Sequence, residues 1–139
     1  MKKTATILAA AAGILALAAC GNPTESLANP SQEQVDEACI VAAESSNASY
    51  SHPEGIEAYT ASLSDSEKVD RLKALKILGN ADSEEGQYIS PDIVEAADSI
   101  EDVTDPEQFS TGHANALRSA QIDCSYGYIK YSGNVEDLQ

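Results

Sequence analysis

Three cysteines are the residues of this sequence with the most reactive chemistry. They stand at Cys20, Cys39 and Cys124 of a 139-residue chain. A thiol can form a disulfide, ligate a metal or react as a free nucleophile, and spacing helps to separate these roles. Neither Cys39 nor Cys124 belongs to a CxxC motif or stands near a spaced histidine pattern, which disfavours zinc. We therefore predict no metal site at these cysteines.

The two histidines offer little further chemistry. His52 precedes a proline, and His113 falls within an expected helix. The chain also lacks a nucleophile elbow, an HExxH motif, a phosphate-binding loop and a haem-attachment motif. We predict no catalytic residue and no cofactor, and we expect His113 to be packed rather than to ligate or catalyse. A hydrolase acting on the cell envelope is the weakest of the functional hypotheses.

The segment 80–92, NADSEEGQYISPD, is the best candidate for a cation site. Carboxylate and amide oxygens are the ligands that Ca²⁺ prefers. An EF-hand register fails, however, because placing Gly86 at the sixth loop position puts Ala81 at the essential first position. The sequence favours a solvated acidic loop, with a divalent-cation site as the alternative.

The N-terminus has the layout of a secretory signal. Lys2 and Lys3 precede an uncharged run over residues 4–19 that is rich in alanine. A membrane-spanning helix needs roughly 20 mostly apolar residues, so this run is too short to span a bilayer comfortably. Residues 1–19 are therefore predicted to be a signal peptide.

The end of this run, Leu17-Ala18-Ala19-Cys20, resembles the lipobox of bacterial lipoproteins. The resemblance covers residues 1–20 only and implies a diacylglyceryl thioether on Cys20, with cleavage before it. It also implies anchorage to the cell membrane or the outer membrane, on the extracytoplasmic side. Gly21 would favour the outer membrane in a bacterium that has one. The alternative is an ordinary signal peptide in which Cys20 is incidental.

With Cys20 assigned to lipid, Cys39 and Cys124 remain as an even pair in an oxidising compartment. We expect them to form a disulfide that links the start and the end of the domain. The sequence has no Trp and a single Phe, so the core should be thin and a covalent cross-link would help to stabilise it. A free reactive pair is the alternative.

The mature chain is strongly acidic. Without Lys2 and Lys3 it holds six basic residues against 23 acidic ones, a net charge of −17. This charge argues against nucleic acid and against lying flat on an anionic leaflet. Four of the basic residues fall within 68–76, while 79–110 has ten acidic residues and no basic one. Such asymmetry could steer a basic protein or peptide, or could simply be balanced within the fold.

Apolar periodicity and capping signals predict an all-α domain of four to five short helices. The strongest starts are the capping boxes at Ser31/Gln34 and Ser64/Glu67. Proline at a first helical position marks two further starts, at Pro53 and Pro91. The helices are expected over 32–46, 53–63, 65–78, 91–101 and 112–124, with turns at 47–52 and 105–107.

The predicted organisation is a signal peptide (1–19), a lipid-anchored linker (20–30), a helical domain (31–126) and a tail (127–139). The end of the chain, from Ser125 onward, contains Tyr126, Tyr128 and Tyr131, which could pack on the bundle or form a contact surface. The functional hypothesis is a noncatalytic envelope lipoprotein that binds a protein or peptide. A lipoprotein that binds a small ligand or a divalent cation is the alternative.

Replacing Cys20 tests the anchor directly. The Cys20→Ala variant should leave the membrane fraction for the soluble fraction, because the thioether carries the acyl chains that hold the protein to the bilayer. Ultracentrifugation of cell membranes followed by immunoblotting measures this. Retention of the variant on membranes after a carbonate wash would contradict the lipobox assignment.

Overall fold

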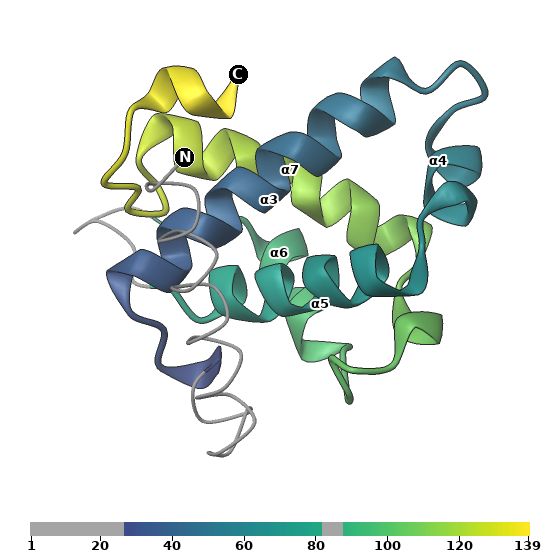
Figure 1. Ribbon diagram of the computed structural model, residues 1–139. Coiled ribbons are helices and arrows are strands. Elements are labelled where there is room, and N and C mark those ends of the chain that lie inside the picture. The colour runs from purple at the N-terminus through teal and green to yellow at the C-terminus, as the bar shows by residue number, and fades with distance from the viewer. Residues whose placement is uncertain (1–26, 82–87) are drawn as a thin grey trace, which may run out of the picture.

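The computed structural model describes residues 27–81 and 88–139, and within them the protein is all-α (Figure 1). The main helices are α3 (Gln32–Ser51), α5 (Asp65–Gly79) and α7 (Thr111–Tyr126). Shorter elements connect or extend them: α4 (Ile56–Ser62), α6 (Pro91–Asp98), and the 3₁₀ turns η1 (Pro106–Gln108) and η2 (Val135–Leu138). The predicted fold class is confirmed.

Two capping boxes fix the starts of α3 and α5 as the sequence predicts. The Ser31 amide donates to Gln34 Oε1 at 2.9 Å, and the Gln34 amide donates back to Ser31 Oγ. Ser64 and Glu67 repeat the arrangement at the start of α5. Each box satisfies two backbone amides at the start of the helix that would otherwise be left to water.

The expected turn at 47–52 is wrong, because α3 continues to Ser51. Ser49 is buried in this extension, and its hydroxyl accepts a hydrogen bond from Arg118 of α7 at 2.8 Å. Packing against α7 thus overrides the weak helix propensity of Asn and Ser. The helix ends where Pro53 disfavours helical geometry for the residue before it.

Helix boundaries shift elsewhere for local reasons. Helix α4 begins at Ile56 rather than at Pro53, because Gly55 has a φ of 91° that no α-helix accommodates. Helix α6 ends at Asp98, three residues before the predicted end. Helix α7 is capped by Ser110, begins at Thr111 instead of residue 112 and extends beyond residue 124 to Tyr126; Gly127, with a φ of 83°, ends it in the left-handed region.

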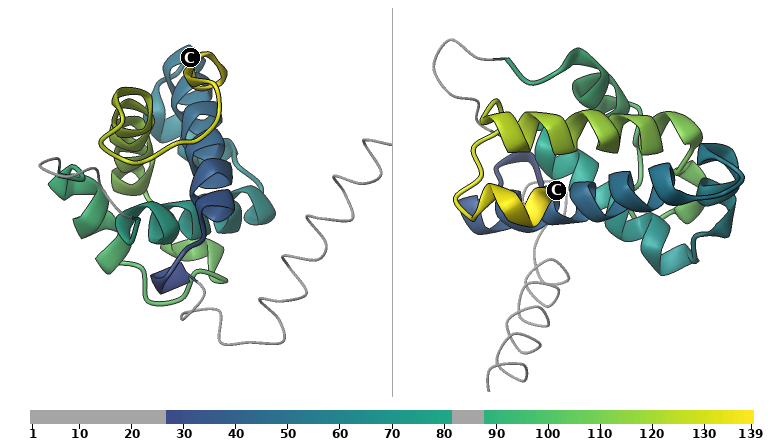
Figure 2. Two further views of the ribbon diagram at one scale, coloured as in Figure 1. Left: turned by 90° about the vertical axis from the view of Figure 1, so that its left-hand side faces the viewer. Right: turned by 90° about the horizontal axis from the view of Figure 1, so that it is seen from above.

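Helices α3 and α7 run antiparallel and side by side, joined by the disulfide between Cys39 and Cys124 (Figure 2). The two cysteines are 85 residues apart in sequence, have a Cα–Cα distance of 6.0 Å and are almost fully buried. The predicted pairing is confirmed. In the chain-entropy treatment, closing a loop of this length stabilises the folded state by about 4–5 kcal/mol.

Helix α5 supplies three leucines to the core. Leu72, Leu75 and Leu78 are fully buried, as expected for the helix with the densest apolar content. Alanines fill most of the space between α3 and α7, which keeps the two axes close. At Gly79 an added Cβ would lie only 2.5 Å from the Ala97 Cβ, so α6 approaches the end of α5 closely.

Both ends of the described chain pack on the bundle. Leu27, within the predicted linker, is partly buried against the core. In the tail, Ile129 and Leu138 are fully buried, and Leu138 also accepts a hydrogen bond from Gln121 at its carbonyl. The tail therefore belongs to the folded unit and covers α3 and α7 at one end of the bundle (Figures 1 and 2).

Removing the disulfide should lower the free energy of unfolding by about 4 kcal/mol, because the unfolded chain regains the freedom of a long loop. Urea unfolding of the mature protein and of a Cys39→Ser/Cys124→Ser variant measures the difference. Dithiothreitol should destabilise the former and leave the double variant unchanged. A difference below about 1 kcal/mol would show that the cross-link contributes little beyond the helix packing.

Candidate functional site

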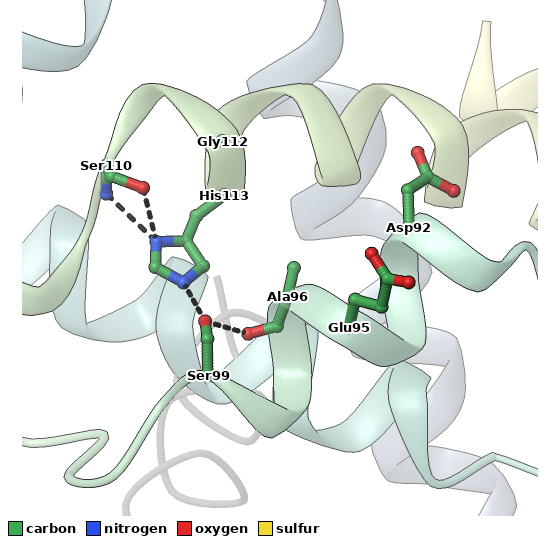
Figure 3. Close-up of a pocket in the computed structure, with 7 residues that line it drawn as sticks. All are labelled: Asp92, Glu95, Ala96, Ser99, Ser110, Gly112 and His113. Carbon is green, nitrogen blue, oxygen red and sulfur yellow. Dashed lines mark hydrogen bonds between the residues drawn. The ribbon is translucent and has the colours of Figure 1, made fainter.

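An open groove of about 310 Å³ lies between α6 and the start of α7 (Figure 3). Helix α6 contributes Asp92, Glu95 and Ala96, and Ser99 follows its last turn. The α7 side is formed by Ser110, Gly112 and His113. The groove thus places two carboxylates, two hydroxyls and one imidazole on two neighbouring elements.

His113 is held from both ring nitrogens. The Ser110 backbone amide donates to Nδ1 at 3.0 Å, and the Ser110 hydroxyl lies 2.9 Å from the same atom. Nε2 lies 2.9 Å from the Ser99 hydroxyl, which in turn donates to the Ala96 carbonyl at 2.7 Å (Figure 3). The ring also stacks on Phe109, with 5.9 Å between centroids. His113 is therefore a packed residue, as the sequence favours.

These contacts determine the tautomer. A backbone amide can only donate, so Nδ1 is the acceptor and the neutral ring carries its proton on Nε2. That proton then points at Ser99 Oγ, and the Ser99 hydroxyl proton goes to the Ala96 carbonyl. A histidine that activates a serine needs the opposite arrangement, with an unprotonated nitrogen facing the hydroxyl. The pair is arranged to cap α7 and to join it to α6, and not to generate a nucleophile.

The acidic side of the groove is only partly engaged. Asp92 accepts a hydrogen bond from the Ser119 hydroxyl of α7, while Glu95 is exposed (Figure 3). Over residues 27–81 and 88–139, no three His, Cys, Asp or Glu side chains are placed to hold a metal ion together. The central part of the predicted acidic loop, 82–87, lies outside the described residues.

Asp123 is a buried carboxylate that the sequence did not single out. It is 2% exposed and accepts hydrogen bonds from the Ser90 amide at 2.7 Å and the Ser90 hydroxyl at 2.8 Å. Its backbone carbonyl accepts from Ile129. Asp123 therefore fixes the start of α6 and the beginning of the tail to the end of α7. Pro91 marks the start of this helix in the sequence, but nothing in the sequence indicates that Ser90 contacts Asp123, 33 residues away.

The tyrosines divide between packing and exposure. Tyr59 is buried, where its hydroxyl lies 2.8 Å from Ser45 Oγ and accepts from Arg71 at 3.0 Å. Tyr131 is partly buried against the core. Tyr126 and Tyr128 are exposed, so the predicted cluster Tyr126, Tyr128 and Tyr131 does not act as one unit.

The remaining sequence-predicted residues do not meet in one site. Cys39 and Cys124 are consumed by their disulfide, and Cys20 lies outside the described residues. His52 and His113 stand on different elements, with His52 near Tyr59. Among the described helices, none combines the length and apolar character that crossing a bilayer requires.

No family model, curated protein or solved structure matches the chain.

Burial lowers the pKa of His113 below its usual value near 6.5, an effect partly offset by the Ala96 carbonyl. The folded protein thus resists protonating His113, whereas the unfolded chain takes up the proton. The stabilising contribution is complete above the unfolded pKa and is lost as the pH falls through 6.5 toward the lower folded value.

The His113→Gln variant should remove this dependence while keeping an acceptor for the Ser110 amide. Thermal melts of both proteins between about pH 8 and pH 5 measure it. The melting temperature of the unsubstituted protein, relative to the variant, should be constant above about pH 7.5 and should fall below about pH 6.5. A constant difference over the whole range would mean that His113 is not held neutral.

Proposed function

We propose that this protein is a noncatalytic lipoprotein of the bacterial envelope that binds a basic protein or peptide at the membrane surface. The anchor is Cys20, through the lipobox that residues 17–20 resemble. The disulfide between Cys39 and Cys124 supports an oxidising, extracytoplasmic location, because such bonds are rare in reducing compartments.

The observation that carries the binding proposal is an acidic face formed by α6 and the segment through η1. It holds seven carboxylates, and all but Asp105 belong to exposed residues. The members of this acidic face are Asp92, Glu95, Asp98, Glu101, Asp102, Asp105 and Glu107. Because no Lys or Arg occurs anywhere in 79–110, the face has no basic residue of its own. A one-signed surface of this kind raises the association rate of an oppositely charged partner.

The basic residues of α5 could in principle balance this face. Arg71, however, donates through Nε to the Tyr59 hydroxyl and through Nη1 to the Glu67 carbonyl, and so serves α4 and α5. Lys68, Lys73 and Lys76 are partly buried on α5. Arg71 is therefore engaged within α4 and α5 and is not available to neutralise the acidic face. The carboxylates of the acidic face can then attract an external cation.

The groove between α6 and α7 supports the alternative function, a lipoprotein that binds a small cationic ligand. Asp92 and Glu95 line a volume suited to a single amine-bearing group, and the exposed Glu95 is open to solvent. A lysine side chain of a bound protein would present the same ammonium group. The arrangement of His113 and Ser99 gives no support to a hydrolase.

A charge-matched pair of triple variants tests the binding proposal. Glu95→Gln/Asp98→Asn/Glu101→Gln neutralises the acidic face, and Glu33→Gln/Glu44→Gln/Glu57→Gln removes the same charge from exposed positions on α3 and α4. Crosslinking pull-downs from membranes compare both with the unsubstituted protein. At about 0.15 M salt, the first variant should recover its basic partner about tenfold less well, and the second should match the unsubstituted protein.

Equal losses in both variants would show that recovery depends on net charge alone. Absence of any partner above background with the unsubstituted protein would contradict protein binding and would favour the small-ligand alternative. A competing oligolysine peptide should displace a partner held by the acidic face, and displacement should weaken as salt is raised.

A further inference from the structure

The surface opposite in character to the acidic face is formed by the end of α7 and the start of the tail. Between Glu107 and Glu136 the chain contains a single carboxylate, Asp123, and that one is buried. The same segment contributes Arg118 and Lys130. Whereas α3, α4, α5 and α6 each carry exposed acidic residues, this segment presents no anionic side chain to solvent.

Apolar and aromatic side chains are exposed within this segment. Tyr126 is 74% exposed, Ile122 is 47% exposed and Tyr128 is 37% exposed. Ile122 and Tyr126 are one helical turn apart on α7, and the rings of Tyr126 and Tyr128 have centroids 6.3 Å apart. These three residues are called the α7-end patch below.

The α7-end patch lies at the end of the bundle where the anchored N-terminal segment joins. Figures 1 and 2 place the end of α7, the start of α3 and the tail together. Gln32, the first residue of α3, donates from its side chain to the Lys130 carbonyl at 2.7 Å, two residues beyond Tyr128. The packed Leu27 is seven positions after Cys20. Even fully extended, that stretch spans at most about 25 Å.

We propose that the α7-end patch rests on the lipid bilayer, so that the anchored domain stands on this end with Ile122, Tyr126 and Tyr128 at the headgroup level. The inference relies on the membrane anchorage included in the proposed function. Tyrosine favours the membrane–water interface, because its ring is apolar and its hydroxyl remains hydrated. Segment 108–135 itself adds no exposed carboxylate to this contact.

This orientation leaves the acidic face accessible. Helix α7 has 16 residues and is therefore about 24 Å long. Segment 101–107 and η1 lead into the start of α7, while Tyr126 is its last residue. The η1 part of the acidic face thus lies at the start of α7, away from Tyr126, whereas Asp92 at the start of α6 contacts Ser119 nearer the patch. A protein bound at the η1 end need not compete with the bilayer.

Single tryptophan reporters test the orientation without background, because the chain has no Trp. Ile122→Trp places the reporter in the α7-end patch. Tyr50→Trp is the matched control, since Tyr50 is 68% exposed near the end of α3 and stacks on Arg118 in a contact that Trp can keep. Both lipidated full-length mature proteins are reconstituted into vesicles of phosphatidylethanolamine and phosphatidylglycerol. Quenching by brominated lipid and by aqueous acrylamide is then measured.

The expected result is strong quenching by brominated lipid and a blue-shifted emission for Ile122→Trp. Tyr50→Trp should instead be quenched mainly by acrylamide. Equal lipid quenching of the two reporters, or stronger quenching of Tyr50→Trp, would overturn the proposed orientation while leaving the anchor intact. Shielding of Ile122→Trp from acrylamide without lipid quenching would assign the patch to a contact with a second copy of this chain and would also overturn it. Vesicles that retain neither protein would contradict the anchor itself, and with it both proposals.

Discussion

The fold depends first on the covalent link between α3 and α7. Cys39 and Cys124 are buried at the contact of the two antiparallel helices, in a core otherwise filled there mainly by alanine. Small side chains let helices approach closely, but each buries little apolar area and so contributes little to stability. A cross-link across 85 residues compensates by restricting the unfolded chain instead of adding contacts to the folded one. The larger side chains of α5 then need to cover only one side of this pair.

Polar contacts take over where apolar ones are few. Helix α6 is held to α7 at three successive levels: Ser90 to Asp123, Asp92 to Ser119, and Ser99 to His113. No described buried side-chain nitrogen or oxygen lacks a hydrogen-bond partner, so these groups are buried without an unsatisfied donor or acceptor. The same seam forms one wall of the groove. The groove thus exists because the short helix α6 has few apolar side chains and is held to α7 largely by hydrogen bonds.

Local signals in the sequence predicted the helices well, and contacts between distant segments were the source of the differences. Capping boxes at Ser31 and Ser64 gave correct starts, because their partners lie three residues away. The extension of α3 through Ser49 depends on Arg118, 69 residues later, and the role of Asp123 depends on Ser90. The groove could not be predicted for the same reason, since its two walls come from separate segments. The acidic surface charge was easier to predict, because the acidic residues of 79–110 are visible in the sequence itself.

If the chain is anchored at Cys20 as proposed, the position of the disulfide has a mechanical consequence. Consider a pull applied to the C-terminal end of α7 while the N-terminus is held. The force would enter α3 at Gln32, and Cys39 lies seven residues further along the chain. From Cys39 the load can pass directly to Cys124 through a covalent bond. The segment between the two cysteines, which includes α4, α5 and α6, then carries none of this force. Tension on the anchor would thus be borne by about two turns of α3 and one sulfur–sulfur bond before it reached the bundle's hydrogen bonds.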